Sequence, residues 1–422
     1  MKKLFASLKN NGLARDNVIF FSASMLLNMI GFVYHAYMGR VLGPAEYGIL
    51  GVMQAILYLL NVVLNVIQTA IARFVSTYKS KKDMSSTKYL FERGQSRAWI
   101  YGLVSLAGYI LAGFFLIDFL NIPFKVYIYL GIIFPFVYLL ALNRGILQGL
   151  QLFIGLGTSN VVEGVFKLAV GVSLVILGWK VGGAVLGMTA SYVGAYIFSR
   201  ISLKKYFSAH PTTSEKKNIS ASMFKYSIPV LITLLALTTL YSFDVFLVKH
   251  YLSGESAGFY AAASLIGKIV FFATLSIIMV MFPKVAESYE NKTHDKTRYI
   301  LNLSLMVMLV MCLSITGFYL LFPDVIILIL FGKNYLPISS LLWLFALAYS
   351  MFSFIYAFSM YNLSVKRYSF IWMLVLVNIL ELILINLYHE TLFEVLSMFS
   401  VSLLVLVVGL GIYTYSLHQQ KT

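Results

Sequence analysis

Twelve long apolar runs constrain the fold of this chain more than any other feature of its sequence. The hydrocarbon core of a bilayer is about 30 Å thick, so a helix that crosses it needs about 20 mostly apolar residues. None of the runs alternates as the strands of a membrane β-barrel do, which are about 10 residues long. The runs cover residues 17–38, 47–75, 98–118, 124–148, 153–177, 181–203, 226–249, 256–283, 299–331, 336–362, 368–388 and 392–417. The sequence therefore predicts an all-α membrane protein of about twelve transmembrane helices.

The composition agrees with a chain that lies almost entirely in the membrane. Of its 422 residues, 60% are hydrophobic and 11% are charged, and the mean hydropathy is +0.85. Soluble proteins average about 45–50% apolar and about 25% charged residues, so a water-soluble enzyme and a disordered chain are excluded. The largest polar gaps, 76–97 and 204–225, are too short for a soluble domain. In the long run 299–331, we expect Pro323 and Asp324 to end the helix and 325–331 to form a short extra turn.

Motifs for metals, cofactors and nucleotides do not occur. Cys312 is the single cysteine, and the six histidines are scattered, so we expect no disulfide and no metal site. No P-loop or glycine-rich nucleotide motif is found, so we expect no nucleotide and no direct use of ATP. The basic start MKKLFASLKNNGLARDN precedes an apolar run too long for a signal peptide, so no cleavable signal is expected.

The basic residues alternate between the two sides of the predicted spans. Cytoplasmic loops collect Lys and Arg. With the N-terminus inside, 24 of the 32 Lys and Arg fall in inside segments, five in outside segments and three within spans. We therefore expect a multi-pass protein of the cell (cytoplasmic) membrane with both termini in the cytoplasm. The net charge of +16 would then face anionic membrane lipids. A nucleic-acid partner is not expected, since it requires a clustered basic face or a motif.

The two halves of the sequence resemble each other weakly. Leu42-Gly-Pro-Ala-Glu-Tyr-Gly48 aligns with Leu252-Ser-Gly-Glu-Ser-Ala-Gly258, and each is the predicted external turn between the first two helices of a six-helix half. Because six is even, both halves have the same orientation, as in carriers built from parallel repeats. We predict two parallel six-helix lobes, 1–211 and 212–422, around a central cleft that opens by alternating access. A duplicated membrane scaffold without transport is the alternative.

Three motifs resemble those of the polysaccharide transporter family. They are Gly39-Arg-Val-Leu-Gly-Pro-Ala-Glu-Tyr-Gly-Ile-Leu50, Lys225-Tyr-Ser-Ile-Pro229 and Gly258-Phe-Tyr-Ala-Ala-Ala263. This family holds the O-antigen and lipid-linked-oligosaccharide flippases. Its superfamily also holds multidrug and toxic-compound extruders and peptidoglycan lipid II flippases. The resemblance implies a transporter rather than an enzyme. Its cargo would be an isoprenoid-pyrophosphate-linked oligosaccharide, moved to the outer leaflet for cell-surface polysaccharide biosynthesis.

The physical problem of such a cargo is its headgroup, whose charges cannot leave water without compensation. A hydrophilic cavity with fixed cations would lower that cost. The alternative within the superfamily is a multidrug or cation antiporter, which we expect to prefer an acidic, aromatic cavity. The predicted spans hold as many bases as acids, and this balance favours an anionic cargo. A membrane glycosyltransferase or polymerase would need a larger loop or domain than this chain has.

Charged residues within spans are the first candidates for function, because an intramembrane charge is costly unless it is paired or hydrated. Lys268 lies near the middle of the eighth span without an acidic neighbour on its own helix. It could contact the phosphates of the cargo or pair with Asp244 of the seventh span. Asp244 could bind a coupling proton or sodium ion, or pair with Lys268, Lys249 or His250. Glu381 of the eleventh span is a second candidate for ion coupling.

Further charges of the first half have both a functional and a structural interpretation. Glu163 and Lys167 are four residues apart, in the order that favours an intrahelical ion pair. Lys167 could still present its charge to a phosphate. Arg40 and Arg73 end the first and second spans, where they could bind phosphate or anchor the helices at headgroups. Arg144 is expected to be a loop charge.

Four amides of the second span share one helical face. Their spacings of 7, 4 and 3 residues place them on that face; they are Gln54, Asn61, Asn65 and Gln68. They could line a hydrated cavity and bind sugar hydroxyls, or form hydrogen bonds between helices.

Overall fold

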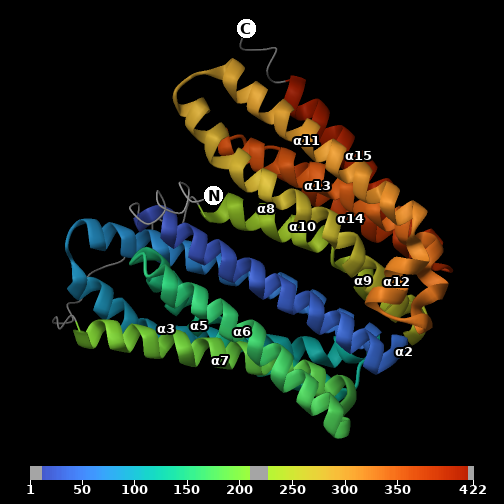
Figure 1. The fold of residues 1–422 in the computed structure, drawn as a ribbon, viewed down its shortest axis with the longest axis horizontal. Coiled ribbons are helices and arrows are strands. Elements are labelled where there is room, and N and C mark those ends of the chain that lie inside the picture. Colours follow the sequence, from blue (N-terminus) through green and yellow to red (C-terminus); the bar gives the residue numbers. More distant parts are fainter. Residues whose placement is uncertain (1–11, 210–226, 417–422) are drawn as a thin grey trace, which may run out of the picture. The chain divides into compact units, whose positions relative to one another are not determined.

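A computed structural model of the chain describes residues 12–209 and 227–416, and every regular element in these ranges is helical (Figure 1). Nine helices of this described part are long and apolar enough to cross a membrane. Two of them, Ala23–Ser80 and Phe153–Ser208, are long enough for two spans each, and Ile371–Leu387 adds a shorter apolar helix. All twelve predicted runs therefore fall on helices, and the all-α membrane fold is confirmed.

Helix α2 (Gly12–Ser80) holds the first two spans and is interrupted at Gly43. A straight helix over Ala23–Ser80, which has 58 residues, would be about 87 Å long, roughly three times the hydrocarbon thickness. Gly43 takes the left-handed value φ 74°, which glycine tolerates best, and Pro44 follows it. Because proline lacks an N–H group and crowds the preceding turn, the helix is broken here, in the turn that the sequence repeat singled out.

The fifth and sixth spans are divided in a similar way. Helix α6 (Phe153–Leu174) continues into the π-helical turn η1 (Val175–Trp179) and then α7 (Lys180–Ala209). Gly178 has φ 89° and Lys180 has φ 48°, so the chain leaves the helical path between these two residues.

The chain divides into two compact units, which are treated separately. The division assigns Met1–Met38 and Leu60–Ser227 to the first unit and Gly39–Leu59 and Ile228–Thr422 to the second, and only 12–209 and 227–416 of these ranges are described. The predicted lobe boundary at 211–212 lies within 210–226, outside the described residues. The turn segment Gly39–Leu59 comes from the first half of the sequence and yet packs within the second unit.

In the first unit, α3, α5, α6 and α7 lie side by side (Figure 1). Asp83 caps the start of α3 (Met84–Leu120) by accepting a hydrogen bond from the Ser86 N–H. The predicted single span 124–148 is divided into α4 (Phe124–Gly131) and α5 (Ile133–Gly149). The division has a physical cause, since Pro135 cannot donate a hydrogen bond to the Gly131 carbonyl one turn earlier.

In the second unit, α10, α11, α13 and α15 pack against one another (Figure 1). The seventh span is divided, like the fourth, and Pro323 begins a separate short helix after α11, as the sequence predicted. The helices are α8 (Ser227–Leu240), α9 (Phe243–Tyr251), α10 (Gly254–Glu290), α11 (His294–Leu321), α12 (Pro323–Leu330), the 3-10 turn η3 (Lys333–Leu341), α13 (Leu342–Ser364), α14 (Ile371–Leu387) and α15 (Leu392–Ser416).

Large apolar side chains also cover outward-facing surfaces of the spans. On α3, Leu111, Phe114 and Phe115 are each more than 60% exposed. In water such a surface would promote aggregation, whereas in a bilayer it faces hydrocarbon. The exposed apolar faces and the length of the helices together indicate a multi-pass membrane protein.

Candidate substrate and ion site

The seventh span, which belongs to the second unit, is broken. Helix α8 ends at Leu240 and α9 begins at Phe243, so Tyr241 and Ser242 lie between two helices. Ser242 is fully buried, and its hydroxyl has no hydrogen-bond partner within the described ranges. Non-helical backbone at membrane depth is found where protein or a hydrated cavity surrounds it, and broken helices form the binding sites of many transporters. The break therefore marks a candidate site.

Asp244 lies in the first turn of α9, directly after the break, and is fully buried. Its Oδ2 accepts a hydrogen bond from the Tyr260 hydroxyl at 2.9 Å, and its Oδ1 accepts one from the Val245 N–H at 2.8 Å. The N-terminus of a helix also attracts negative charge, because its N–H groups are unpaired and the helix dipole points that way. The break thus creates the surroundings that hold a carboxylate inside the protein.

Lys268 of α10 is 5% exposed and lies among tyrosine rings. Its Nζ is 5.0 Å from the ring centre of Tyr58, 5.1 Å from that of Tyr241 and 5.8 Å from that of Tyr349. A desolvated cation over an aromatic face gains about 2 kcal/mol. Asp244 attracts Lys268 electrostatically, but no hydrogen bond or ion pair joins the ammonium group to any residue in the described ranges.

Glu381 of α14 belongs to the same group of side chains. It is 1% exposed, its Oε1 has no hydrogen-bond partner in the described structure, and it interacts electrostatically with Asp244. We call this group the charge cluster; its members are Tyr58, Tyr241, Asp244, Tyr260, Lys268, Tyr349 and Glu381. Chemically, it offers one cation to an anionic ligand and two carboxylates to a proton or a sodium ion.

The first unit contains a second group of buried charges, and here the sequence-based pairing needs revision. Glu163 Oε2 accepts a hydrogen bond from Arg144 Nη2 at 2.7 Å. Arg144, expected in a loop, is buried in α5 and also contacts Ser159. The loop prediction was wrong because the fourth span continues through Arg144, and the Glu163 carboxylate compensates its charge.

Lys167 also lies in the first unit, on α6. Its Nζ is 3.4 Å from Nε2 of His35 and 4.6 Å from the ring centre of Tyr34. Glu163 attracts it electrostatically, so the glutamate acts on two cations rather than on one. Lys167 therefore lies among groups that moderate the cost of burying its charge.

The four amides of α2 fall in both units. Asn61 accepts a hydrogen bond from the Tyr192 hydroxyl at 2.8 Å, and Gln68 donates one to Gln148 at 2.9 Å. Asn65 is exposed, and Gln54 belongs to the segment Gly39–Leu59 of the second unit. For Asn61 and Gln68, these contacts favour the interpretation as bonds between helices.

The two arginines at the span ends have different surroundings. Arg40 donates hydrogen bonds from Nη2 to the Leu328 carbonyl at 3.1 Å and from Nε to the Leu330 carbonyl at 3.3 Å, and it also contacts the Ile329 carbonyl. These carbonyls belong to the last turn of α12, where the helix itself provides no donors, so Arg40 caps that helix. Arg73 is exposed on α2.

Sequence reasoning found the charges of the cluster but missed its tyrosines. Tyr58, Tyr241, Tyr260 and Tyr349 are four of 29 tyrosines, and many tyrosines in such a chain belong to membrane interfaces. The position of Tyr241 could have been predicted in part, because Tyr241, Ser242 and Asp244 form a polar stretch that interrupts an apolar span. His35, next to Lys167, carried the general signal of an intramembrane ionisable residue.

Comparison with known proteins places this arrangement in a family. The sequence model of the family described as "Polysaccharide biosynthesis protein" matches residues 13–289, about two thirds of the chain. The chain belongs to this family. The predicted resemblance to polysaccharide transporters is thereby confirmed. An uncharacterised membrane protein of Methanocaldococcus jannaschii is 23% identical over 292 residues, which cover 65% of this chain and 68% of the relative.

Solved structures with the same fold are transporters of the MOP superfamily and a flippase. The inward-facing form of a multidrug resistance MATE family transporter has a TM-score of 0.76 at 12% identity, covering 96% of this chain and 99% of that one. The lipid II flippase MurJ, in an inward closed conformation, has a TM-score of 0.71 at 17% identity, covering 94% and 87%. The chain thus shares the MOP fold. Family and fold agree with the prediction that it is not an enzyme.

Proposed function

We propose that this member of the polysaccharide biosynthesis family flips an isoprenoid-pyrophosphate-linked oligosaccharide across the cell membrane. The headgroup would move from the cytoplasmic to the outer leaflet by alternating access of two six-helix lobes, while the lipid tail stays in the bilayer. The family, the MOP fold and the likeness to a lipid II flippase support this proposal. The alternation of basic loops supports cytoplasmic termini.

Lys268 is the observation that carries the proposal. A buried ammonium group costs several kcal/mol unless its surroundings compensate, and here tyrosine rings and a nearby Asp244 do so without a direct ion pair. A cation held in this way keeps its hydrogen-bond donors available for an incoming anion. A pyrophosphate provides negative oxygens for all three N–H groups of the lysine.

The carboxylates of the charge cluster supply a way to couple transport to an ion gradient. Asp244 and Glu381 repel each other when both are charged, so binding a proton or a sodium ion relieves that repulsion. A neutralised Asp244 would no longer attract Lys268, and the lysine would then be available to bind phosphate. Cargo and ion would affect each other's binding equally, since such coupling is reciprocal.

An antiporter for organic cations is the second candidate. Two buried carboxylates beside several tyrosines would also suit a positively charged drug, and the fold is that of a multidrug transporter. The two functions differ in the role of Lys268, which would attract a pyrophosphate and repel an organic cation.

The decisive experiment measures flipping of a pyrophosphate-linked oligosaccharide in proteoliposomes. We expect Lys268→Ala to reduce flipping at least tenfold, and Lys268→Arg to retain part of it, because the charge remains while the geometry changes. The matched control is Lys296→Ala, which removes an exposed lysine of the same unit and should leave flipping unchanged.

Two results would count against the proposal. Normal flipping by correctly inserted Lys268→Ala would remove the lysine from the transport step. Efflux of an organic cation that increases in Lys268→Ala, without any flipping by the wild type, would favour the antiporter.

A further inference from the structure

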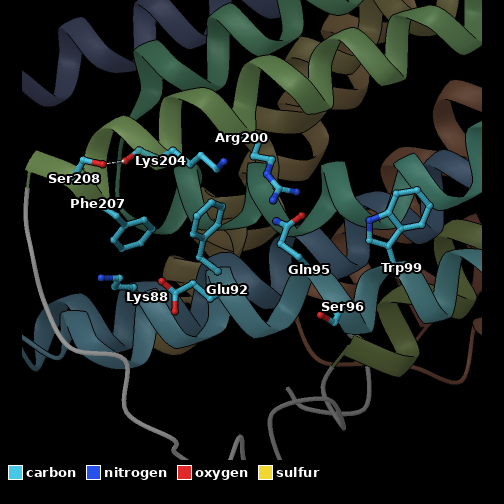
Figure 2. Close-up of a pocket in the computed structure, with 10 residues that line it drawn as sticks. Lys88, Glu92, Gln95, Ser96, Trp99, Arg200, Lys204, Phe207 and Ser208 are labelled. Carbon is cyan, nitrogen blue, oxygen red and sulfur yellow. Dashed lines mark hydrogen bonds between the residues drawn. The ribbon is translucent and has the colours of Figure 1, made fainter.

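A polar pocket lies between α3 and α7 of the first unit, apart from all residues assigned to transport above. Its volume is about 720 Å³. Figure 2 shows Lys88 and Trp99 toward opposite ends of the pocket, with Arg200 and Gln95 between them. Three basic residues and one acidic residue, Glu92, line it. The full lining is Lys88, Phe91, Glu92, Gln95, Ser96, Trp99, Arg200, Lys204, Phe207 and Ser208.

The sequence builds this pocket from two helical faces. Lys88, Glu92 and Trp99 recur at the helical spacing along α3, and Arg200 and Lys204 are four apart on α7. The rings of Phe91 and Phe207 stack with a centroid distance of 5.3 Å and join the two helices at one end. The cations are thus brought together by packing.

A buried hydrogen-bond network holds the base of the pocket. Gln95 donates to Asn143 at 2.7 Å and accepts from the Tyr196 hydroxyl at 3.2 Å. Asn143 in turn donates to Ser199 at 3.1 Å. Arg200 contacts the Tyr196 hydroxyl. The contact with Tyr196 fixes one N–H group of the Arg200 guanidinium, so that its other N–H groups are available to a ligand in the pocket.

We propose that this pocket binds the headgroup of an anionic phospholipid. Arg200 and Lys204 supply the charge and the donors that a phosphodiester requires. One turn beyond the polar lining, Leu103 of α3 is about half exposed, and Trp99, one turn before it on the same helical face, is partly exposed. These apolar side chains continue the pocket onto the membrane-facing surface. An anionic headgroup with attached acyl chains matches both the basic lining and the adjoining apolar surface, whereas a free phosphate matches only the basic lining.

The position in the chain agrees with this ligand. The pocket contains Lys88 from the basic loop region after the second span, and Arg200 and Lys204 from the basic region after the sixth span. The charge pattern assigns both regions to the cytoplasmic side, where anionic lipids are abundant. It shares no residue with the charge cluster, so the proposal stands independently of the cargo.

The test uses the fluorescence of Trp99 in nanodiscs. The full chain carries Trp179→Phe, Trp343→Phe and Trp372→Phe, so that Trp99 is the only tryptophan. The nanodiscs are phosphatidylcholine with increasing brominated phosphatidylglycerol, which quenches a nearby indole. We expect quenching at lower mole fractions than with brominated phosphatidylcholine. Each of Arg200→Gln and Lys204→Gln should raise the mole fraction of brominated phosphatidylglycerol needed for quenching roughly fivefold.

A second pocket of the chain provides a matched control. It lies between α10 and α11, has a volume of about 760 Å³ and contains Lys284, Lys296 and Glu287, but its lining has neither arginine nor tryptophan. The variant Lys284→Gln/Lys296→Gln removes the same amount of charge as the two pocket substitutions together and should leave the quenching of Trp99 unchanged. Lys204 is exposed, so Lys204→Gln remains informative if Arg200→Gln fails to fold.

Three outcomes would overturn the proposal. Equal quenching by the two brominated lipids means that the pocket does not select anionic headgroups. An equal loss in the control variant means that only the general surface charge acts. Displacement of the lipid by inorganic phosphate at low ionic strength means that the pocket recognises free phosphate rather than a lipid.

Discussion

The hydroxyl of Tyr260 donates a hydrogen bond directly to the Asp244 carboxylate. Hydrogen bonds to charged groups contribute about 1.5–3 kcal/mol, and those between neutral groups about 0.5–1.5 kcal/mol. Tyr319 provides a neutral comparison in the same unit, since its buried hydroxyl donates to the Ile266 carbonyl at 3.0 Å. The two tyrosines therefore allow the charge state of Asp244 to be tested by stability alone.

We expect Tyr260→Phe to lower the free energy of unfolding in detergent by about 1.5–3 kcal/mol, and Tyr319→Phe by about 0.5–1.5 kcal/mol. Thermal or denaturant unfolding of purified variants measures both. Equal losses would indicate that Asp244 is protonated in the folded protein, and the ionic form of the proposed coupling would then be wrong.

A second prediction at the residue scale concerns ion coupling. Asp244→Asn should keep slow flipping in proteoliposomes but remove its dependence on a pH or sodium gradient, because the amide cannot bind either ion as a carboxylate does. The control is Asp324→Asn, which changes a carboxylate of α12 outside the charge cluster. A wild type that ignores both gradients would reduce Asp244 to an electrostatic neighbour of Lys268.

At the scale of elements, the two repeated turns pack directly against each other within the second unit. A Cβ on Gly258 of α10 would lie 1.8 Å from the Pro44 carbonyl oxygen, and one on Gly48 would lie 2.9 Å from the Gly258 nitrogen. The segment Gly39–Leu59 can approach α10 this closely only because both positions lack a side chain. The glycines matched between the halves of the sequence are therefore contact residues in space.

Gly258→Ala should consequently force the segment away from α10. Overpacking a tight contact costs about 1–3 kcal/mol, and we expect a corresponding loss of thermal stability together with reduced flipping. A Cβ added to Gly317 of α11 would have no neighbouring atom of the described structure within 4 Å, so Gly317→Ala is the control and should be neutral or slightly stabilising. A Gly258→Ala variant as stable as the wild type would show that the turn moves without cost.

At the scale of the whole molecule, alternating access requires some contacts to break in each cycle. The segment Gly39–Leu59 is our candidate for a moving contact, since it comes from the first half of the sequence but packs with helices of the second. A disulfide across this contact would hold it closed. The Cβ of Ala45 lies 3.7 Å from the position that a Cβ would take on Gly254, within the range of about 3.5–4.5 Å that disulfides require.

In a Cys312→Ser background, Ala45→Cys/Gly254→Cys should form this disulfide under oxidising conditions and stop flipping. Reduction should restore transport, and each single cysteine variant should be insensitive to oxidant. Full transport by a completely cross-linked protein would mean that the contact between the turn and α10 stays closed throughout the cycle.

The spans and their helical type follow from the sequence, because the bilayer imposes a simple rule. Each span needs about 20 apolar residues, and its backbone groups must bond within the helix. The runs of the sequence therefore predict the spans, and Gly43-Pro44 predicts the turn between the first two. The break after α11 was predicted from Pro323, but the breaks inside the fourth and seventh spans were missed. Pro135 was a usable signal for the break between α4 and α5. The break before Asp244 had a weaker signal, namely the polar residues around it.

Tertiary structure alone decided which groups surround each buried charge. Sequence spacing paired Glu163 with Lys167, and packing of α5 against α6 gave it Arg144 as its direct partner. Lys268 has rings from α2, α13 and the break between α8 and α9 around it, and Asp244 accepts a hydrogen bond from a tyrosine of α10. Helical periodicity specifies which residues share a face, but not which neighbouring helix that face meets. Because a buried charge is stabilised by neighbours distant in sequence, its environment is determined only when the helices pack.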